Sequence, residues 1–175
     1  MHKNVELKAR CPNPDEVRSA LLELDPEETG TDQQVDTYFQ VNQGRLKLRE
    51  GNIENNLIYY ERPDQSGPKE ADIHLYETES GSDLKPMLEV ALGVLVVVEK
   101  RREIYFLENV KFHIDRVDGL GSFVEIEAID QTGNFSTDEL RNQCQTYMEQ
   151  LGIDRDQLVS SSYSDLLLEK RDSRS

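Results

Sequence analysis

Cysteine is scarce in this chain of 175 residues, which has only two cysteines and no tryptophan. Cys11 follows the first predicted strand, and Cys144 lies on the apolar stripe of a predicted late helix. Because the two lie far apart in the sequence and in unlike contexts, we expect free thiols, with a disulfide as the alternative.

Long apolar runs and an excess of basic charge are also missing. No stretch approaches the roughly 18 uninterrupted apolar residues of a membrane span, and residues 1–3 lead into a strand pattern instead of a signal sequence. The 35 acidic residues outnumber the 20 basic ones, which gives a net charge of -15. This charge argues against nucleic acid or an anionic membrane as a partner, since both would repel the protein. We therefore expect a soluble, cytoplasmic protein.

Several catalytic signatures are absent as well. The sequence contains no GxxxxGK[ST] phosphate loop, no GxSxG turn and no CxxC pair for zinc. Neither cysteine has a recognisable base partner. Catalysis by a nucleophilic side chain is therefore disfavoured, and metal-assisted phosphoryl transfer fits better.

What the chain does contain is strict alternation of polar and apolar residues. In residues 122–127, Phe123, Glu125 and Glu127 fall on one face of a predicted strand, while Val124 and Ile126 fall on the other. Residues 4–8 show the same partition, with Glu6 and Lys8 opposite two apolar residues. If helices cover the apolar faces, the charged faces must meet each other or line a cavity.

The order of elements indicates one domain, 1–175, of the α+β class. Strands are predicted at 4–10, 34–41, 45–51, 57–62, 72–78, 94–107, 111–117 and 122–129. Asn13 is expected to cap a helix that begins at Pro14, and Ser136 with Glu139 forms a capping box for a later one. Between them, a helix at 84–92 is predicted with an apolar stripe along one side. Nearly all strands follow in hairpin order, so we predict an eight-stranded antiparallel barrel, closed or nearly closed, with helices packed outside. Residues 169–175 are expected to fray.

The polar faces of these strands carry a consistent set of charged residues. The set is Glu6, Lys8, Lys47, Arg49, Arg62, Lys100, Arg102, Lys111, His113, Asp115, Glu125 and Glu127. With the histidine neutral, seven members are positive and four are negative, so the interior is predicted to be locally positive inside an acidic shell. The alternatives are solvated basic faces on surface strands, or a network of internal salt bridges.

A cavity with so many basic groups suits a polyanion. Arginine binds two phosphate oxygens at once, and lysine acts as a point charge on a flexible stem. Mg²⁺ or Mn²⁺ bridging the oxygens of a triphosphate would need oxygen ligands, which Glu6, Glu125 and Glu127 could supply. His113, next to Asp115 on the same face, is either a proton carrier or a hydrogen-bonded wall residue.

These motifs together resemble the CYTH superfamily, also called triphosphate tunnel metalloenzymes. The resemblance extends from residue 4 to residue 167 and is closest to the branch similar to class IV adenylyl cyclases. The matching segments are 4–10 (NVELKAR), 45–49 (RLKLR), 60–64 (YERPD), 99–102 (EKRR), 113–115 (HID) and 119–127 (GLGSFVEIE).

The resemblance implies a role for each charged residue. The residues implied to bind the substrate phosphates are Lys8, Lys47, Arg49, Arg62, Lys100, Arg102 and Lys111. The implied metal ligands are Glu6, Glu125 and Glu127, with Asp115 as a further member, and we assign His113, Asp115 and Lys8 to catalysis. Asn4 stands where the ExExK motif of the family has its first glutamate, which puts a second metal ion in doubt.

The function expected from this resemblance is metal-dependent phosphoryl transfer on a small-molecule triphosphate. The substrate would be a nucleoside triphosphate, thiamine triphosphate or tripolyphosphate. The enzyme would either hydrolyse it or cyclise ATP to cyclic AMP with release of pyrophosphate. The alternative is a non-catalytic module that binds nucleotide or polyphosphate. The protein is expected to act as a monomer or homodimer.

Overall fold

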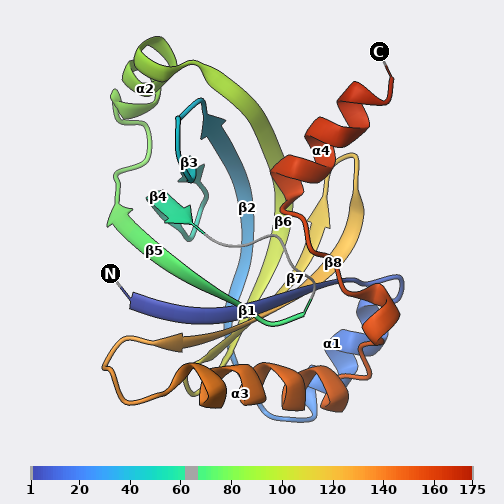
Figure 1. The fold of residues 1–175 in the computed structure, drawn as a ribbon. Helices are drawn as coiled ribbons and strands as arrows, with labels where there is room; N and C mark the ends of the chain where they lie inside the picture. The colour runs from blue at the N-terminus through green and yellow to red at the C-terminus, as the bar shows by residue number, and fades with distance from the viewer. Residues whose placement is uncertain (1, 62–66, 175) are drawn as a thin grey trace.

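A computed structural model describes residues 2–61 and 67–174 of the chain. In these residues, eight antiparallel strands close into a barrel with helices outside it, which confirms the predicted fold (Figure 1). The strands are β1 (His2–Arg10), β2 (Glu27–Phe39), β3 (Arg45–Glu50), β4 (Asn55–Glu61), β5 (Lys69–Glu77), β6 (Val94–Leu107), β7 (Val110–Val117) and β8 (Gly121–Asp130).

The barrel closes through its first strand. Around the ring the order is β1, β5, β4, β3, β2, β6, β7 and β8, and β8 pairs with β1 again. In that closing pair, Glu6 lies opposite Glu127 and Lys8 lies opposite Glu125. The two charged segments that stand out at opposite ends of the sequence are therefore direct neighbours.

Most predicted strand boundaries agree with the structure to within a few residues, but β2 is longer than predicted. It begins at Glu27 instead of residue 34, because it pairs with β6 from Glu27 opposite Phe106 to Phe39 opposite Val94. The additional residues are mostly polar and show no alternation. Pairing with a long partner strand, and not their own pattern, makes them a strand.

The three helices with predicted positions lie close to them, as α1 (Pro14–Leu22), α2 (Leu84–Leu92) and α3 (Thr137–Gln150). The structure also contains the short 3₁₀ helix η1 (Arg155–Gln157) and α4 (Tyr163–Asp172). The capping box of Ser136 and Glu139 is confirmed, whereas the Asn13 side chain makes no capping hydrogen bond and that part of the prediction is wrong. Helix α4 continues to Asp172. The fraying expected for residues 169–175 stays a prediction.

The main core lies outside the barrel, between its wall and two helices. Val5 and Leu7 of β1, Phe112 of β7 and Ile126 of β8 turn their side chains outward and pack with Leu140 of α3. Other residues of α1 and α3 complete this layer, and Figure 1 shows α3 lying across β1 and β8. The same alternation that buries these apolar side chains turns the charged ones inward.

A second apolar cluster closes one end of the barrel beneath α4. Tyr38, Tyr60, Val98, Phe123 and Tyr163 are all buried there. Helix α4 begins with Ser162, whose side chain accepts a hydrogen bond from the Asp165 backbone N–H at 3.1 Å, and this cap directs Tyr163 toward the barrel.

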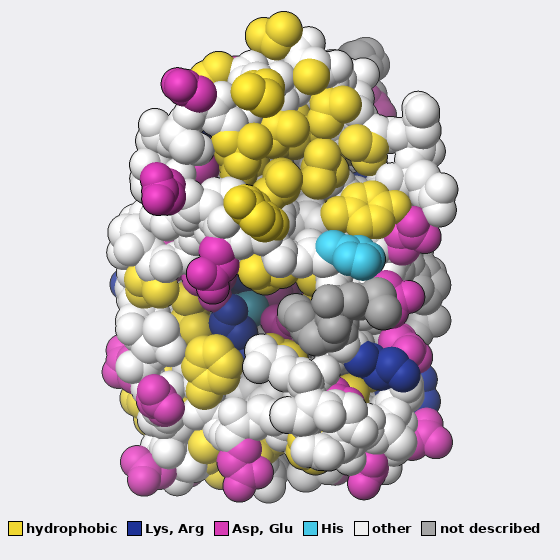
Figure 2. All heavy atoms as spheres, turned by 90° about the vertical axis from the view of Figure 1, so that its left-hand side faces the viewer, with side chains coloured by type: hydrophobic (Ala, Val, Ile, Leu, Met, Phe, Trp, Pro, Cys, Tyr) yellow, Lys and Arg dark blue, Asp and Glu magenta, His cyan; other side chains and the backbone are white. Residues whose placement is uncertain are grey.

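Helix α2 differs from α1, α3 and α4 because none of its residues is buried. It projects at the upper left of Figure 1, and Met87 and Val90 expose 64% and 90% of their surface. The apolar stripe predicted from the sequence exists, but it faces outward. Figure 2 shows hydrophobic side chains gathered on this face above a central hollow.

Two further expectations concern the state of the cysteines and the absence of a membrane-spanning segment. Cys11 and Cys144 are both buried and unbridged, as predicted. No helix in the described ranges combines the length and apolar character needed to cross a membrane.

Candidate functional site

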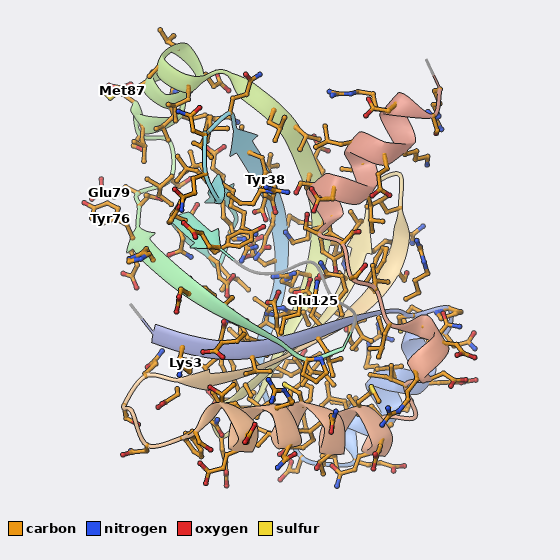
Figure 3. All side chains as sticks on the ribbon, viewed as in Figure 1. Lys3, Tyr38, Tyr76, Glu79, Met87 and Glu125 are labelled. Carbon is orange, nitrogen blue, oxygen red and sulfur yellow. The ribbon has the colours of Figure 1, made fainter. Side chains whose placement is uncertain are left out.

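The interior of the barrel contains a cavity of about 840 Å³, part of which opens to solvent. Ten residues of the predicted set line it: Glu6, Lys8, Lys47, Arg49, Lys100, Arg102, Lys111, His113, Glu125 and Glu127. They come from β1, β3, β6, β7 and β8, and each occupies an inward position of its strand. Glu125 and Tyr38 can be seen inside the barrel in Figure 3.

On one side of the cavity, three cations share a single carboxylate, that of Asp36. Arg49 binds it with two hydrogen bonds of 2.9 Å, Lys100 Nζ lies 2.8 Å away, and Lys47 Nζ lies 3.2 Å away. We call Asp36, Lys47, Arg49 and Lys100 the cation wall. Burial alone would raise the pKa of Asp36, but its cations outweigh burial and hold that pKa well below its usual range.

Lys100 is the most strongly perturbed member of the cation wall. Burial lowers its pKa to about 7, while the Asp36 carboxylate opposes this shift and the nearby Arg49 adds to it. The ammonium is therefore only partly protonated near neutral pH in the empty cavity. An incoming anion would favour its charged form.

The turn between β3 and β4 brings another acid into the cavity. Asp32 accepts hydrogen bonds from the backbone N–H groups of residues 52, 53 and 54 at 2.7–2.9 Å and so fixes this turn. Gly51 must be small, because a Cβ atom there would lie 2.5 Å from the Asp32 carboxylate. The turn places Glu54 where it pairs with Arg49 at 3.0 Å and with Lys111.

On another side of the cavity, Arg102 is held by two carboxylates. The Arg102 guanidinium donates two hydrogen bonds to the Asp115 carboxylate, at 2.7 and 2.6 Å. The same guanidinium lies 3.1 Å from the Glu125 carboxylate. Asp115 also accepts a hydrogen bond of 2.7 Å from the Tyr163 hydroxyl. These contacts place Asp115 behind Arg102, outside the lining of the cavity.

The Glu125 carboxylate contacts three side chains, those of Lys8, Arg102 and His113. It lies 3.4 Å from Lys8 Nζ and 3.2 Å from His113 Nδ1, in addition to Arg102. Burial would raise the pKa of Glu125, but Arg102 and Lys8 overcome this effect and hold the pKa well below its usual range. The Lys8 ammonium also lies 4.0 Å from the centre of the Tyr163 ring, a cation–π contact.

His113 is fully buried and its pKa is lowered, first by burial and then by the charge of Arg102. The imidazole is therefore neutral at pH 7. Since Glu125 is ionised, the ring proton belongs on Nδ1, which donates to that carboxylate. Nε2 is left as an acceptor, and it has no hydrogen-bond partner in the described part of the chain.

The second acidic group of the cavity is the cross-strand pair Glu6 and Glu127. Glu127 accepts a hydrogen bond of 2.5 Å from the amide of Asn4, whose own oxygen is buried and has no partner among residues 2–61 and 67–174. We call Glu6, Glu125 and Glu127 the acid wall. It offers carboxylate and amide oxygens, the donors that Mg²⁺ and Mn²⁺ prefer.

The described residues contain no preformed group of three histidine, cysteine or acidic side chains that could hold a metal ion. Glu125 is already tied to Lys8 and Arg102. Glu6 and Glu127 therefore fit a divalent cation only if water and substrate oxygens complete its coordination, as is common for Mg²⁺. The metal ligands stay a prediction.

Three positions that the sequence singled out are not in the described lining of the cavity. Arg62 lies outside the described residues, and Asp115 and Asn4 are buried beside the cavity. Sequence reasoning missed Asp36, although Gln34, Asp36 and Tyr38 show the same alternation on β2. It also missed Glu54, Asn56, Tyr38, Tyr60, Ser162 and Tyr163, all of which line the cavity.

The additional acids change the expected charge balance. The described lining and the two buried acids behind it carry six basic side chains and six acidic ones. Among the described residues the interior is thus balanced, with Arg62 of the predicted set lying outside them, and the salt-bridge network considered as an alternative is present. The charge is nevertheless segregated between the cation wall and the acid wall.

Comparison with known proteins agrees with this architecture. The model of the CYTH domain matches residues 2–163. The structure of the PH1012 protein from Pyrococcus horikoshii is similar, with 25% identity and a TM-score of 0.79 over 95% of this chain and 99% of that one. No curated protein matches significantly.

Two further solved structures share the fold at lower identity. A putative adenylate cyclase from Vibrio parahaemolyticus is 20% identical, with a TM-score of 0.78 over 94% of this chain and 97% of that one. The putative adenylyl cyclase HpAC1 from Hippeastrum, described as having a dominant triphosphatase activity, is 14% identical, with a TM-score of 0.63 over 98% and 96% of the two chains. The family match over nearly the whole chain, the closed barrel and its charged interior lead to one conclusion: this chain belongs to the CYTH domain family.

Proposed function

We propose that the protein is a divalent-metal-dependent enzyme that hydrolyses a triphosphate inside its barrel. The observation that carries the proposal is the segregation of charge within one cavity. Lys47, Arg49 and Lys100 gather on one side, and Glu6 and Glu127 lie together on another. A metal-bound polyphosphate has both kinds of charge and can satisfy both walls at once.

The cation wall would bind the phosphate oxygens. Asp36 holds its three cations close together in the empty protein, so they need little reorganisation when an anion arrives. Arg102 is held in the same way by Asp115 and Glu125. A phosphate oxygen can bind the remaining N–H groups of each guanidinium without breaking these pairs.

The acid wall would supply the oxygen ligands for a cation. Glu6 and Glu127, with Asn4 beside them, would hold Mg²⁺ or Mn²⁺, which when bound neutralises negative charge on the phosphate oxygens. The Asn4 amide orients Glu127 through their hydrogen bond. Asn4 adds no charge of its own, which favours one strongly bound metal ion over two.

His113 is the best candidate to receive a proton. Its Nε2 is an acceptor with no partner among the described residues, and Glu125 fixes the tautomer through Nδ1. Nε2 would accept the proton of the attacking water, and the resulting imidazolium would be stabilised by the Glu125 carboxylate. Lys8, which also pairs with Glu125, would neutralise the charge developing on the phosphate.

Cyclisation of ATP is the second candidate, because the described residues of β4 and β5 that line the cavity are uncharged and could take a base. Cyclisation additionally requires the ribose 3′ oxygen to be held against the α-phosphorus. Hydrolysis requires only water in that place, so the present residues account for it more fully.

The product of the reaction tests the proposal. We would incubate the protein with ATP, tripolyphosphate and thiamine triphosphate under Mg²⁺ and Mn²⁺ and resolve phosphate, pyrophosphate and cyclic AMP. Phosphate release with no cyclic AMP is expected. Cyclic AMP with pyrophosphate would identify a cyclase. Binding without any turnover would contradict both and leave a non-catalytic binding module.

A further inference from the structure

On one side of the cavity, the described lining residues carry no charge. The inward side chains of β4 and β5 that line the cavity include Ile58, Ala71, Ile73 and Leu75, which we call the apolar wall. Ile58 lies opposite Leu75 in the pairing of the two strands, so the four side chains form one continuous surface. The other lining residues of these two strands, Asn56 and Tyr60, are also uncharged.

The apolar wall runs from the interior to the mouth of the barrel. Ala71 and Ile58 are buried, Ile73 is partly buried, and Leu75 exposes 47% of its surface. Tyr76 follows directly on the outer face of the same strand and lies at the outer edge in Figure 3. Apolar surface is thus left uncovered where the cavity opens.

Such a wall is unsuitable for phosphate. A phosphate oxygen placed against it would lose water and gain no hydrogen bond, which is unfavourable. An uncharged ring placed there would bury apolar surface on both sides, which is favourable. An inorganic polyphosphate would therefore leave this side of the cavity unused, whereas a phosphate ester with an organic group would use it.

We propose that the substrate is an organic triphosphate and not inorganic tripolyphosphate, with its ring-bearing part lying on the apolar wall. This inference rests on the proposed function, because it assumes that the cation wall holds the phosphate chain of the same molecule. The continuity of the two walls within one cavity supports the assignment.

The test compares ligands that share the phosphate chain. Affinities for tripolyphosphate, ATP and thiamine triphosphate would be measured by calorimetry in EDTA, which prevents metal-dependent turnover. The inorganic anion carries at least as much charge, so the cation wall alone cannot favour the organic ligands. At least one of them should bind about tenfold more tightly than tripolyphosphate.

The substitution Leu75→Gln assigns this preference to the apolar wall. It should weaken binding of the preferred organic triphosphate about fivefold and leave tripolyphosphate binding unchanged. Leu22→Gln is the matched control, because Leu22 of α1 is similarly exposed, at 49%, but does not line the cavity. Melting temperatures of both variants would show that folding is retained.

Three outcomes would overturn the inference. Equal or tighter binding of tripolyphosphate would remove the need for an organic group while leaving triphosphatase activity intact. If Leu75→Gln weakened the binding of all ligands equally, the apolar wall would not contact the ring-bearing part of the substrate specifically. Absence of binding in EDTA together with absence of turnover under Mg²⁺ and Mn²⁺ would refute the proposed function, and this inference with it.

Discussion

The cation wall and the acid wall are built by the same alternating pattern, yet they balance their charges differently. In the cation wall, three basic side chains share one acid, Asp36, and only Arg49 has a second acidic partner, Glu54, among the described residues. In the acid wall, Glu125 is paired with Lys8 and Arg102, while Glu127 is held by the neutral Asn4. The comparison suggests that the acid of the cation wall is needed for the empty protein to be stable, whereas Glu127 is available for a ligand.

The largest expected effect comes from removing the shared acid. Asp36→Asn keeps the size of the side chain but leaves the buried charges of Arg49 and Lys100 without their main partner. Removing one partner of a buried ion pair is costly, so the free energy of unfolding should fall by about 3–5 kcal/mol. Urea denaturation at pH 7 measures this change.

Asp72→Asn is the control for that substitution, because Asp72 lies exposed on β5. Tripolyphosphate should restore part of the stability of the Asp36→Asn variant, since its negative charge replaces the missing carboxylate. If Asp36→Asn were as stable as the control, the cation wall would not depend on its acid and the comparison would fail.

Glu127→Gln tests the opposite wall. The new amide can still accept the hydrogen bond from Asn4, so the free energy of unfolding should change by less than about 1 kcal/mol. Metal-dependent turnover should nevertheless fall about 100-fold or more, because a carboxylate ligand is lost. Initial rates measured across a range of Mg²⁺ and Mn²⁺ concentrations report this loss.

The partner substitution Glu125→Gln sharpens the contrast. It should destabilise the protein clearly, because Arg102 and Lys8 lose a charged partner. Activity of Glu127→Gln near the wild-type level would exclude Glu127 from the reaction.

The smallest expected effect is a change in the protonation of Lys100, a member of the cation wall. Lys100 has a pKa of about 7 in the empty protein, lowered mainly by burial, so it is largely neutral at pH 8.5. Tripolyphosphate should raise this pKa and cause uptake of a fraction of one proton per bound anion. Calorimetry in two buffers with different ionisation enthalpies measures this uptake.

Lys100→Arg should abolish the proton uptake, because the guanidinium stays charged at every accessible pH. Stability provides a second readout with a defined sign. Between pH 7 and about 10.5 the unfolded chain holds a proton on Lys100 that the folded protein lacks, so this group makes the free energy of unfolding rise with pH. Identical proton uptake in Lys100→Arg would show that another group titrates. The groups facing Lys100 are Asp36, Lys47, Arg49, Arg102 and Tyr163.

The alternation of charged and apolar residues was sufficient to predict the barrel and most of its interior. A strand places every second side chain on the same face, so Glu125 and Glu127, or Lys47 and Arg49, could be assigned to one surface from their spacing alone. Asp36 follows the same rule and could have been found, since Gln34 and Tyr38 flank it on the inward face of β2.

Glu54 and Tyr163 could not be found in this way. Glu54 lies in a turn that Asp32 fixes from a distant strand, and Tyr163 lies in the first turn of α4. Neither element has a period that relates it to the barrel interior. The outward position of the α2 stripe escaped prediction for the same reason, because periodicity defines a face of a helix but not what covers it.

The pairing of β1 with β8 also has a consequence for how the protein is made. Lys8 is placed opposite Glu125, and the Tyr163 ring that contacts Lys8 comes later still. During synthesis β1 therefore lacks its partner β8 until residues 121–130 have emerged from the ribosome. Contacts so distant in sequence form slowly. The cavity should accordingly appear in the last cooperative step of folding, and a nascent chain that stops before α4 should have all eight strands but lack the Tyr163 ring beside Lys8.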